Sequence, residues 1–286
     1  MRRYATVDVF TETPFGGNPL AVVLDAAGLT AEQMQALARE FNYSETTFVL
    51  PPADPAHTAR VRIFTPGSEL PFAGHPNVGT AYVLASRNPG LPETLLFEER
   101  AGLVPVRVLR DGGKVTGAEL TAPEALSVRA AVPADEVAAC LGLAAGDLRT
   151  DAHEPTVVSV GLPFLVAELA GREALARARV DAASFGATLP RDGANAVYVY
   201  CREADGSLQA RMFSPLDGIG EDPATGSAAA AVSAFLASLR QTDVTLRIGQ
   251  GADMGRPSQL TARVVQGKAH VGGACVALME GMISLP

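Results

Sequence analysis

Short runs in which apolar and polar residues alternate make up much of the chain, and they predict strands. Residues 4–10 and 20–24 alternate in this way, with a Gly-Gly-Asn-Pro turn between them. After the capping-box sequence Thr30-Ala-Glu-Gln, apolar residues recur at helical spacing as far as Phe41. This helix has one apolar stripe, so we expect it to cover the outside of a sheet.

The following segment, residues 42–50, enters a strand rich in Thr, Phe and Val, and Glu45 stands near its beginning. Residues 60–64 form the returning strand. Three further strand candidates lie between residues 95 and 120, where glycine-containing breaks at 101–102 and 111–113 separate them. The first half of the chain therefore predicts mostly sheet.

Two longer stretches, residues 64–84 and 213–239, share one design. Each runs from Phe-(Ser/Thr)-Pro through a loop to a polar residue, then through Pro-x-x-Gly-x-Ala into an apolar helix. A helix without a polar face belongs inside a protein, so we predict a buried central helix in each half and an internal duplication. The corresponding residues are His75 and Asp222, Gly79 and Gly226, and Thr80 and Ser227.

The second half of the chain repeats the order of the first. We expect helices at 134–141 and 173–180, and strands within 156–169 and at 196–200, 208–213, 244–248, 260–265 and 269–276. The prediction is an α+β fold of two duplicated lobes, each a curved mixed β-sheet around a central α-helix. We place the boundary within 121–133. Residues 1–124 then form the N-terminal lobe and residues 125–286 the C-terminal lobe, whose last strand can pack back on the first lobe.

The start of the second central helix has its own chemistry. Asp222 is a preferred N-cap residue, and Pro223 would then occupy the first helical position, where its missing N–H costs nothing. Backbone N–H groups from Ala224 to Gly226 would be free at the positive end of the helix dipole. Such a helix start binds a carboxylate or another anion. We therefore expect both helix starts to face one cleft between the lobes, where the active site lies.

Composition narrows the classes of partner. The 286 residues carry a formal net charge of −8 and contain no cluster of lysine and arginine, which argues against a nucleic-acid partner. The beginning of the chain is strand-like, and no uninterrupted apolar stretch of about 20 residues occurs, so we expect neither a signal peptide nor a membrane partner. The expected location is cytoplasmic.

The sequence also argues against metal, dinucleotide and disulfide chemistry. The four histidines show no metal-ligand spacing, and the glycine-containing segments lack the G-x-G-x-x-G arrangement after a strand. The three cysteines are odd in number and widely spaced, so neither a disulfide framework nor a zinc site is indicated. We predict no cofactor and no metal.

Six short motifs occur in order across most of the chain. They are Gly16-Gly-Asn-Pro19, Ser44-Glu-Thr46, Phe64-Thr-Pro66, Gly74-His-Pro76, Glu221-Asp-Pro-Ala-Thr-Gly-Ser227 and Gly255-Arg-Pro-Ser258. Together they resemble the phenazine-biosynthesis PhzF-like family. The resemblance implies the diaminopimelate-epimerase-like fold and a homodimeric enzyme without cofactor or metal. The family's named enzyme isomerises trans-2,3-dihydro-3-hydroxyanthranilate, but many relatives with these motifs do not make phenazines, so the substrate does not follow from the fold.

The resemblance also implies a set of site residues. The catalytic candidates are Glu45, His75 and Asp222, and the substrate-binding candidates are Asn18, Gly74, Gly226 and Ser227. Among them, Glu45 matches the family's acid/base, and the two glycines match positions that let a substrate carboxylate approach the backbone. Glu45 and His75 belong to the predicted N-terminal lobe, whereas Asp222 and Ser227 belong to the C-terminal one. Asn18 lines the cleft or forms a turn.

Each candidate also has a structural alternative. Moving a proton on carbon requires a base that later returns it, and a carboxylate can do both if burial raises its pKa from about 4.3 toward neutrality. Glu45 can instead cap its strand or pair with an arginine, and His75, which titrates near neutrality, can cap a helix. Asp222 can cap a helix and bind a substrate amine at the same time. Arg256 can attract an acidic substrate or form a surface salt bridge.

These observations favour a cofactor-independent isomerase that moves a carbon-bound proton on a small amino or carboxylic acid. A non-catalytic relative that binds a small molecule or a protein is one alternative, against which the intact candidate residues argue. An amino-acid racemase or epimerase is another. Such enzymes of the same fold place cysteines where this chain has His75 and Asp222. The cysteines of this chain fall at neither helix start, and they are Cys140, Cys201 and Cys275.

Overall fold

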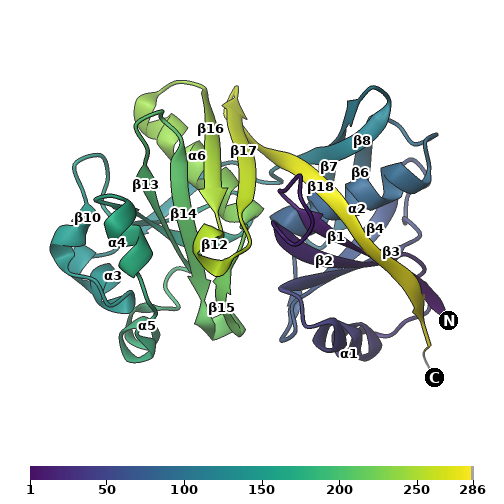
Figure 1. The fold of residues 1–286 in the computed structure, drawn as a ribbon, viewed down its shortest axis with the longest axis horizontal. Coiled ribbons are helices and arrows are strands. Elements are labelled where there is room, and N and C mark those ends of the chain that lie inside the picture. The colour runs from purple at the N-terminus through teal and green to yellow at the C-terminus, as the bar shows by residue number, and fades with distance from the viewer. Residues whose placement is uncertain (285–286) are drawn as a thin grey trace.

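A computed structural model describes residues 1–284, which form two lobes that lie side by side (Figure 1). The first lobe contains β1 (Arg2–Val9), β2 (Asn18–Val23), α1 (Ala31–Phe41), β3 (Glu45–Leu50), β4 (Ala59–Phe64), β5 (Glu69–Leu70), α2 (Gly74–Arg87), β6 (Thr94–Glu99), β7 (Gly102–Asp111) and β8 (Lys114–Thr121). The second lobe begins with β9 (Ser127–Ala131), α3 (Ala134–Cys140), η1 (Ala145–Asp147), β10 (Leu148–Arg149), β11 (Thr156–Ser159), β12 (Pro163–Leu169), α4 (Arg172–Arg177) and α5 (Ala182–Thr188). It continues with β13 (Val197–Arg202), β14 (Leu208–Ser214), η2 (Pro215–Asp217), β15 (Ile219–Asp222), α6 (Gly226–Arg240), β16 (Val244–Gln250), η3 (Ala252–Met254), β17 (Ser258–Val265) and β18 (Lys268–Ile283).

Strand pairing confirms the duplication. In the first lobe β2 and β3 are parallel, β4 pairs antiparallel with β3 and β5, and β4 is also parallel to β6. The second lobe repeats these pairings. There β12 and β13 are parallel, β14 pairs antiparallel with β13 and β15, and β14 is also parallel to β16. The antiparallel series β6–β7–β8 corresponds to β16–β17–β18. Each lobe is therefore a mixed sheet with one long helix, as the sequence predicts. This helix is α2 after β5 in the first lobe and α6 after β15 in the second.

The last strand joins the two lobes. β18 pairs with β17 of the second lobe, then with β8 and, over its C-terminal part, with β1 of the first lobe. Figure 1 shows it in yellow, crossing diagonally from one lobe to the other, so that both chain ends lie at the first lobe. The predicted boundary segment 121–133 contains β9, which pairs with β11. The exact division between residues 124 and 125 stays a prediction.

Helix α1 forms as its sequence predicts. The Thr30 side chain accepts a hydrogen bond from the Gln33 backbone, and the Gln33 side chain accepts one from the Thr30 backbone. Its apolar stripe, which includes Met34, packs in a separate small core with Phe48 and Phe64 of the sheet. Figure 1 shows α1 at the outer end of the first lobe. The helix therefore covers a sheet and leaves the opposite face for α2.

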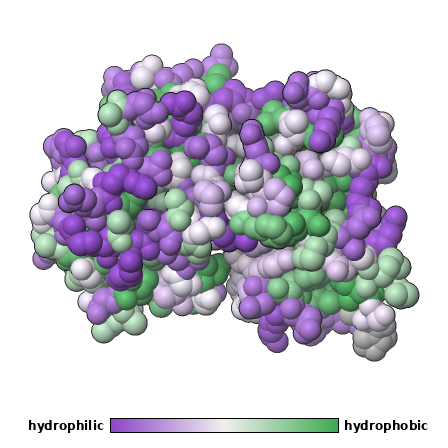
Figure 2. Space-filling model, viewed as in Figure 1, coloured by the Kyte–Doolittle hydropathy of each residue, from purple (hydrophilic) through white to green (hydrophobic). Residues whose placement is uncertain are grey.

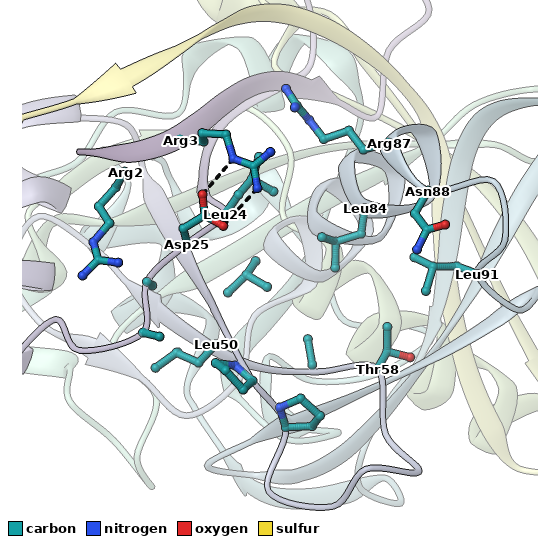
Figure 3. Close-up of a pocket in the computed structure, with 16 residues that line it drawn as sticks. Arg2, Arg3, Leu24, Asp25, Leu50, Thr58, Leu84, Arg87, Asn88 and Leu91 are labelled. Atoms are coloured by element: carbon teal, nitrogen blue, oxygen red, sulfur yellow. Dashed lines mark hydrogen bonds and ion pairs between the residues drawn. The ribbon is translucent and has the colours of Figure 1, made fainter.

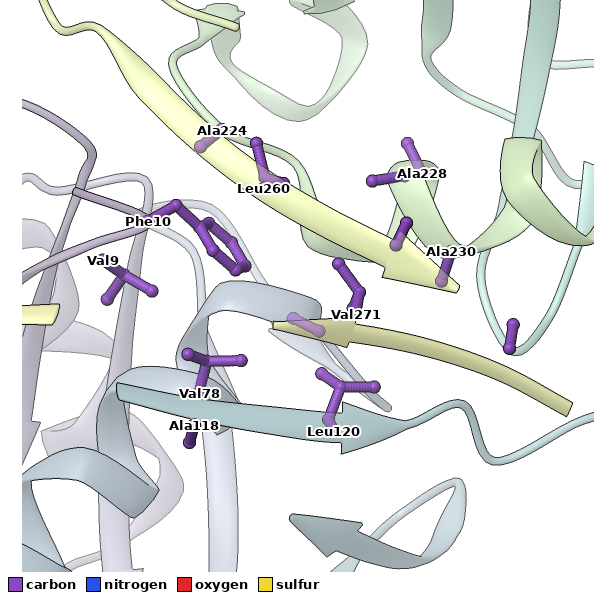
Figure 4. Packing of buried hydrophobic residues seen from close by; sticks show 14 of the residues in the cluster. Val9, Phe10, Val78, Ala118, Leu120, Ala224, Ala228, Ala230, Leu260 and Val271 are labelled. Atoms are coloured by element: carbon purple, nitrogen blue, oxygen red, sulfur yellow. The ribbon is translucent and has the colours of Figure 1, made fainter. Parts of the chain in front are cut away.

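Helices α2 and α6 are buried, as predicted. Residues 226–237 of α6 are all buried, and both helices contribute to one apolar core that extends through the two lobes. Figure 4 shows part of this core, where Val78 of α2 and Ala228 of α6 lie among residues of β8, β17 and β18. Because the small residues of α6 present little bulk, neighbouring elements can approach it closely on every side.

The predicted starts of the two central helices were wrong. α2 begins at Gly74 rather than Pro76, and α6 begins at Gly226, with Thr225 before it. Asp222 is not an N-cap, because it is the last residue of β15 and its pairing with Met212 of β14 keeps it extended. The two corresponding residues therefore differ in their secondary structure: His75 is the second residue of α2, whereas Asp222 precedes α6.

No helix within residues 1–284 is both long enough and apolar enough to span a membrane. Figure 2 shows polar residues over most of the visible face of the second lobe, whereas apolar residues gather on the visible face of the first lobe. A notch separates the two lobes at the lower edge of this view.

Candidate active site

A cavity of about 110 Å³ is lined by residues of both lobes. Of the seven residues predicted for the site, six line it, and the seventh, Asn18, lies behind it. The lining residues among the predicted set are Glu45, Gly74, His75, Asp222, Gly226 and Ser227. Fold duplication thus brings together side chains that are more than 100 positions apart in the sequence.

Asn18 is fully buried and connects the two lobes at the site. Its Nδ2 atom donates hydrogen bonds to Asp222 Oδ1 at 2.8 Å and to the Ala224 carbonyl at 2.9 Å. Its Oδ1 atom accepts a hydrogen bond of 2.7 Å from Ser44 Oγ, which fixes the orientation of the amide. The structure therefore makes Asn18 a support for Asp222 rather than a residue of the cavity wall.

Asp222 has two further supports from its own lobe. Thr225 Oγ1 donates a 2.6 Å hydrogen bond to Asp222 Oδ2, and Gln250 Nε2 donates to the Asp222 carbonyl at 2.8 Å and to Thr225 Oγ1 at 3.0 Å. The Thr225 N–H in turn donates to Gln250 Oε1 at 3.2 Å. Each Asp222 carboxyl oxygen thus has one donor, and the side chain is held in one orientation.

Burial raises the pKa of Asp222 from 3.8 to about 6, although hydrogen bonds from Thr225 and Asn18 act in the opposite direction. Asp222 is therefore largely ionised at pH 7. The pKa of Glu45 is raised well above 4.5, first by burial and then by the negative charge of Asp222. Two carboxyl groups of one site thus both have a raised pKa, and the charge of Asp222 contributes to the shift of Glu45.

His75 faces Glu45 as a neutral ring. Burial lowers the pKa of His75 to about 3, with a small opposing effect of the Pro19 carbonyl. Its Nδ1 atom lies 3.1 Å from Glu45 Oε2 and 3.2 Å from the amide nitrogen of Asn18. The two hydrogens of that amide already serve two closer acceptors, so the Nδ1 lone pair remains available to a proton on Glu45. Because the His75 ring is neutral, this contact is not an ion pair.

Glu45 and His75 each have a buried polar atom in this site without a hydrogen-bond partner, Oε2 and Nε2 respectively. Glu45 begins β3, where it pairs with Leu20 of β2, and its Oε2 atom is buried without a hydrogen-bond partner of good geometry. The strand cap and the arginine pair that the sequence allowed are both absent from its contacts among residues 1–284. A buried polar oxygen without a partner in a cavity is a group poised to bind something else.

The two glycines bring the helix starts together. A Cβ atom added at Gly74 would lie 2.7 Å from Gly226 Cα, and one added at Gly226 would lie 3.2 Å from Gly74 Cα and 3.0 Å from the Phe10 ring. These positions therefore need glycine for close helix packing. The first residues of both helices have no intrahelical acceptor for their N–H groups, and the two positive dipole ends meet at the cavity.

The free N–H groups of α6 differ from those expected. They belong to Gly226, Ser227 and Ala228, because the helix begins later than predicted and the Thr225 N–H is already bonded to Gln250. Ser227 is the second helical residue, not a residue one turn into the helix. It lines the cavity.

Arg256 does not line this cavity. Its guanidinium donates to the Gly16 and Gly17 carbonyls at 2.8 Å each and to Asp8 Oδ1 at 2.6 Å. The two family-like motifs that contain Gly16 and Arg256 are thus bonded to each other across the lobes. Because Asn18 directly follows the bound turn, this contact helps to hold Asn18 beside Asp222.

Several site residues were missed by the sequence analysis. Ser44 and Thr225 lie inside quoted motifs, next to or near named candidates, so the motifs held a usable signal. Gln250 had none, because it reaches Asp222 from a strand 28 residues later. Asp217 and Asn195, which also line or border the cavity, stand in loops whose conformation no periodicity predicts.

Neither the cysteines nor the largest groove belongs to this site. All three cysteines are buried and free, and none lines the cavity. A groove of about 660 Å³ lies on the first lobe, at a place lined by Arg2, Leu84 and Leu91, with Arg3 bound to Asp25 (Figure 3). None of the seven predicted residues lines that groove.

Comparisons with known proteins agree with this geometry. Residues 7–281 match the family model described as phenazine biosynthesis-like protein (PhzC-PhzF). An uncharacterized isomerase of Mesorhizobium japonicum is 41% identical over 99% of this chain and 98% of its own. A trans-2,3-dihydro-3-hydroxyanthranilate isomerase of Pseudomonas aeruginosa is 39% identical over 92% of this chain and 90% of its own.

Solved structures show the same fold. A PhzF-family protein of Bacillus anthracis, 26% identical, superposes with a TM-score of 0.87 over 99% of both chains. A probable proline racemase of Agrobacterium radiobacter, 13% identical, superposes with a TM-score of 0.71 over 100% of this chain and 94% of its own, which supports the fold alone. The chain therefore belongs to the phenazine biosynthesis-like PhzC-PhzF family and is an isomerase.

Proposed function

We propose that the protein is a cofactor-independent isomerase that moves a carbon-bound proton on a small amino or carboxylic acid, as the reaction name of its Pseudomonas aeruginosa relative suggests. The observation that carries the proposal is the state of Glu45. Its carboxyl group lines an enclosed cavity, has a raised pKa, and leaves Oε2 without a hydrogen-bond partner. A carboxyl group in this state is suited to take a proton from carbon and to return it.

In the proposed reaction, the Glu45 carboxylate removes a proton from a substrate carbon. The electrons of the broken C–H bond enter the conjugated system of the substrate and move toward its carboxylate. Glu45 is then a carboxylic acid whose proton exchanges with solvent, and it gives a proton to a different carbon of that system. The Nδ1 lone pair of His75, 3.1 Å from Glu45 Oε2, accepts a hydrogen bond from the acid and holds it between the two transfers.

Two groups would hold the substrate. The N–H groups at the starts of α2 and α6, together with Ser227, would bind its carboxylate, where the negative charge increases as the proton leaves. Asp222, ionised and fixed by Asn18 and Thr225, would bind its amine. A substrate cation beside Asp222 would offset the charge that raises the pKa of Glu45, and the base would then ionise more readily.

Proton NMR in deuterated water tests the reaction class. The protein is incubated with trans-2,3-dihydro-3-hydroxyanthranilate, and the expected result is an isomer in which the carbon that gains the proton carries deuterium. If that compound is left unchanged, the same assay is applied to other amino and cyclic carboxylic acids. The absence of deuterium at carbon in every compound of such a panel would contradict the proposal.

The binding of the carboxylate is tested separately by isothermal titration. A carboxylic acid and its methyl ester are compared, and only the acid is expected to bind, because the ester cannot accept hydrogen bonds from both helix starts as an anion. Equal affinity for the two would remove this assignment. The homodimer and the cytoplasmic location stay predictions, and sedimentation would test the first by a mass of twice 29.6 kDa.

A further inference from the structure

The cavity wall carries an acidic group that the proposed reaction does not use. A third acidic side chain, Asp217 of η2, lines the cavity in addition to Glu45 and Asp222. Ser214 Oγ donates a hydrogen bond of 2.6 Å to Asp217 Oδ2, and Asn195 Nδ2 donates one of 3.1 Å to Asp217 Oδ1. Both donors also line the cavity. The carboxylate is therefore held in a fixed orientation at the cavity wall.

This carboxylate has unused capacity to accept hydrogen bonds. An ionised carboxylate offers about four lone-pair sites, and Ser214 and Asn195 occupy two of them without neutralising its charge. Among the described residues that line the cavity there is no lysine and no arginine. A ligand group that brings a positive charge or a strong donor would therefore find a free acceptor there.

Asp217 also acts on the reacting end of the cavity. Its negative charge is one of the causes that raise the pKa of Glu45, so the two groups lie within electrostatic range of each other. Glu45 Oε2, buried and without a hydrogen-bond partner, lines the same enclosed space. A small molecule in this cavity would therefore meet the base and Asp217 at the same time.

We infer that Asp217 is a specificity-determining residue, which binds an ammonium or hydroxyl group of the substrate other than the groups bound by Asp222 and the helix starts. The inference rests on the proposed function for the position of the substrate carboxylate. It implies that the substrate carries at least two polar groups besides the reacting carbon. Simple carboxylic acids would bind weakly, because they leave the Asp217 charge without a partner.

A matched pair of ligands tests the inference by isothermal titration. The probes are 3-amino-5-(aminomethyl)benzoate and 3-amino-5-ethylbenzoate. Both carry a ring amine for Asp222, and they differ by an ammonium in place of a methyl group. We expect the wild type to prefer the ammonium compound by about tenfold or more, as for a hydrogen bond to a charged group. Asp217→Asn should remove most of this preference. Asp253→Asn, which changes an exposed acid outside the cavity, should keep it.

Two results would overturn the inference. One is a wild type that binds both compounds equally, and the other is Asp217→Asn protein that keeps the full preference while its melting curve matches the wild type. Glu45→Gln separates this test from the reaction itself, because it removes the base and not Asp217. Loss of deuterium uptake in Glu45→Gln with the ligand preference kept would support both the role of Glu45 as the base and the role of Asp217 in binding the ligand. No deuterium uptake in the wild type with the preference kept would defeat the proposed function and leave the assignment of Asp217 standing.

Discussion

Replacement of Asp222 by asparagine should make the protein more stable and inactive at once. The pKa of this carboxyl group is 3.8 in the unfolded chain and about 6 in the fold, chiefly because of burial. The ionised form is thus less stable in the fold than in the unfolded chain. At about 1.36 kcal/mol for each pH unit, the difference corresponds to about 3 kcal/mol lost by the wild type at pH 8.

The sign of the pH dependence follows from the same two pKa values. As the pH falls through about 6, Asp222 takes up a proton in the fold first, so the penalty shrinks and is mostly gone at pH 4. Asparagine carries no such charge. It keeps the hydrogen bond from Asn18 but presents an amide nitrogen to Thr225 or forces that hydroxyl to turn, at a cost of about 1 kcal/mol.

The expected outcome is that Asp222→Asn is more stable than the wild type by about 2 kcal/mol at pH 8, a rise in Tm of about 5 °C. This advantage should be lost between pH 8 and pH 4. Activity should drop by about 100-fold or more at pH 8, because the anion that binds the substrate is gone. Thermal melts of both proteins across this pH range, with activity measured at pH 8, provide the data.

Asp253→Asn is the matched control. Because Asp253 is exposed, its replacement removes no buried charge, and we expect no gain in stability. A stability difference between Asp222→Asn and the wild type that stays constant from pH 8 to pH 4 would refute the reasoning. So would a variant that is less stable than the wild type at pH 8. Either result would mean that the fold does not strain the Asp222 charge.

Three further predictions concern the helix starts, the pH profile and the thiols. Gly74→Ala should lower the free energy of unfolding by about 3 kcal/mol, because the added Cβ meets the Gly226 backbone. Gly186→Ala should not, because a Cβ there meets nothing within 4 Å, and thermal melts compare the two variants. The value of kcat/KM should fall as the pH is lowered through about 6, because Asp222 gains a proton and no longer binds the substrate as an anion; a flat profile from pH 8 to pH 5 would contradict this. Iodoacetamide should leave the activity of the folded protein unchanged, because burial raises the pKa of each thiol, that of Cys201 to about 11. Rapid inactivation would instead support a mechanism that uses a thiol.

Much of the fold could be predicted because it depends on local patterns. The capping box at Thr30, the alternation of the strands and the apolar runs of the central helices each specify an element from a few neighbouring residues. The duplication was visible because both halves repeat one motif before their long helix. Pairing of β18 with β1 follows from closure of the sheet over more than 260 residues, which no local pattern specifies.

The site was predictable in its members but not in its geometry. The motifs identified Glu45, His75 and Asp222, yet they gave the wrong helix starts. Asp222 is a preferred N-cap residue, but its pairing with Met212 of β14 keeps it in a strand. The role of Asn18 was also hidden, since its partner Asp222 is 204 residues away. Burial, which sets the protonation of these groups, is a property of the assembled lobes and has no signature in the sequence.

The central claim, that Glu45 carries the proton between two carbons, is tested most directly by comparing wild type with Glu45→Gln in deuterated water. Proton NMR follows deuterium uptake at carbon in trans-2,3-dihydro-3-hydroxyanthranilate or in whichever acid of the panel the wild type converts. Glutamine keeps the size of the side chain and cannot accept a proton, so uptake should fall by about 100-fold or more while ligand binding is kept. Equal uptake in the two proteins would remove Glu45 as the base and contradict the proposed mechanism.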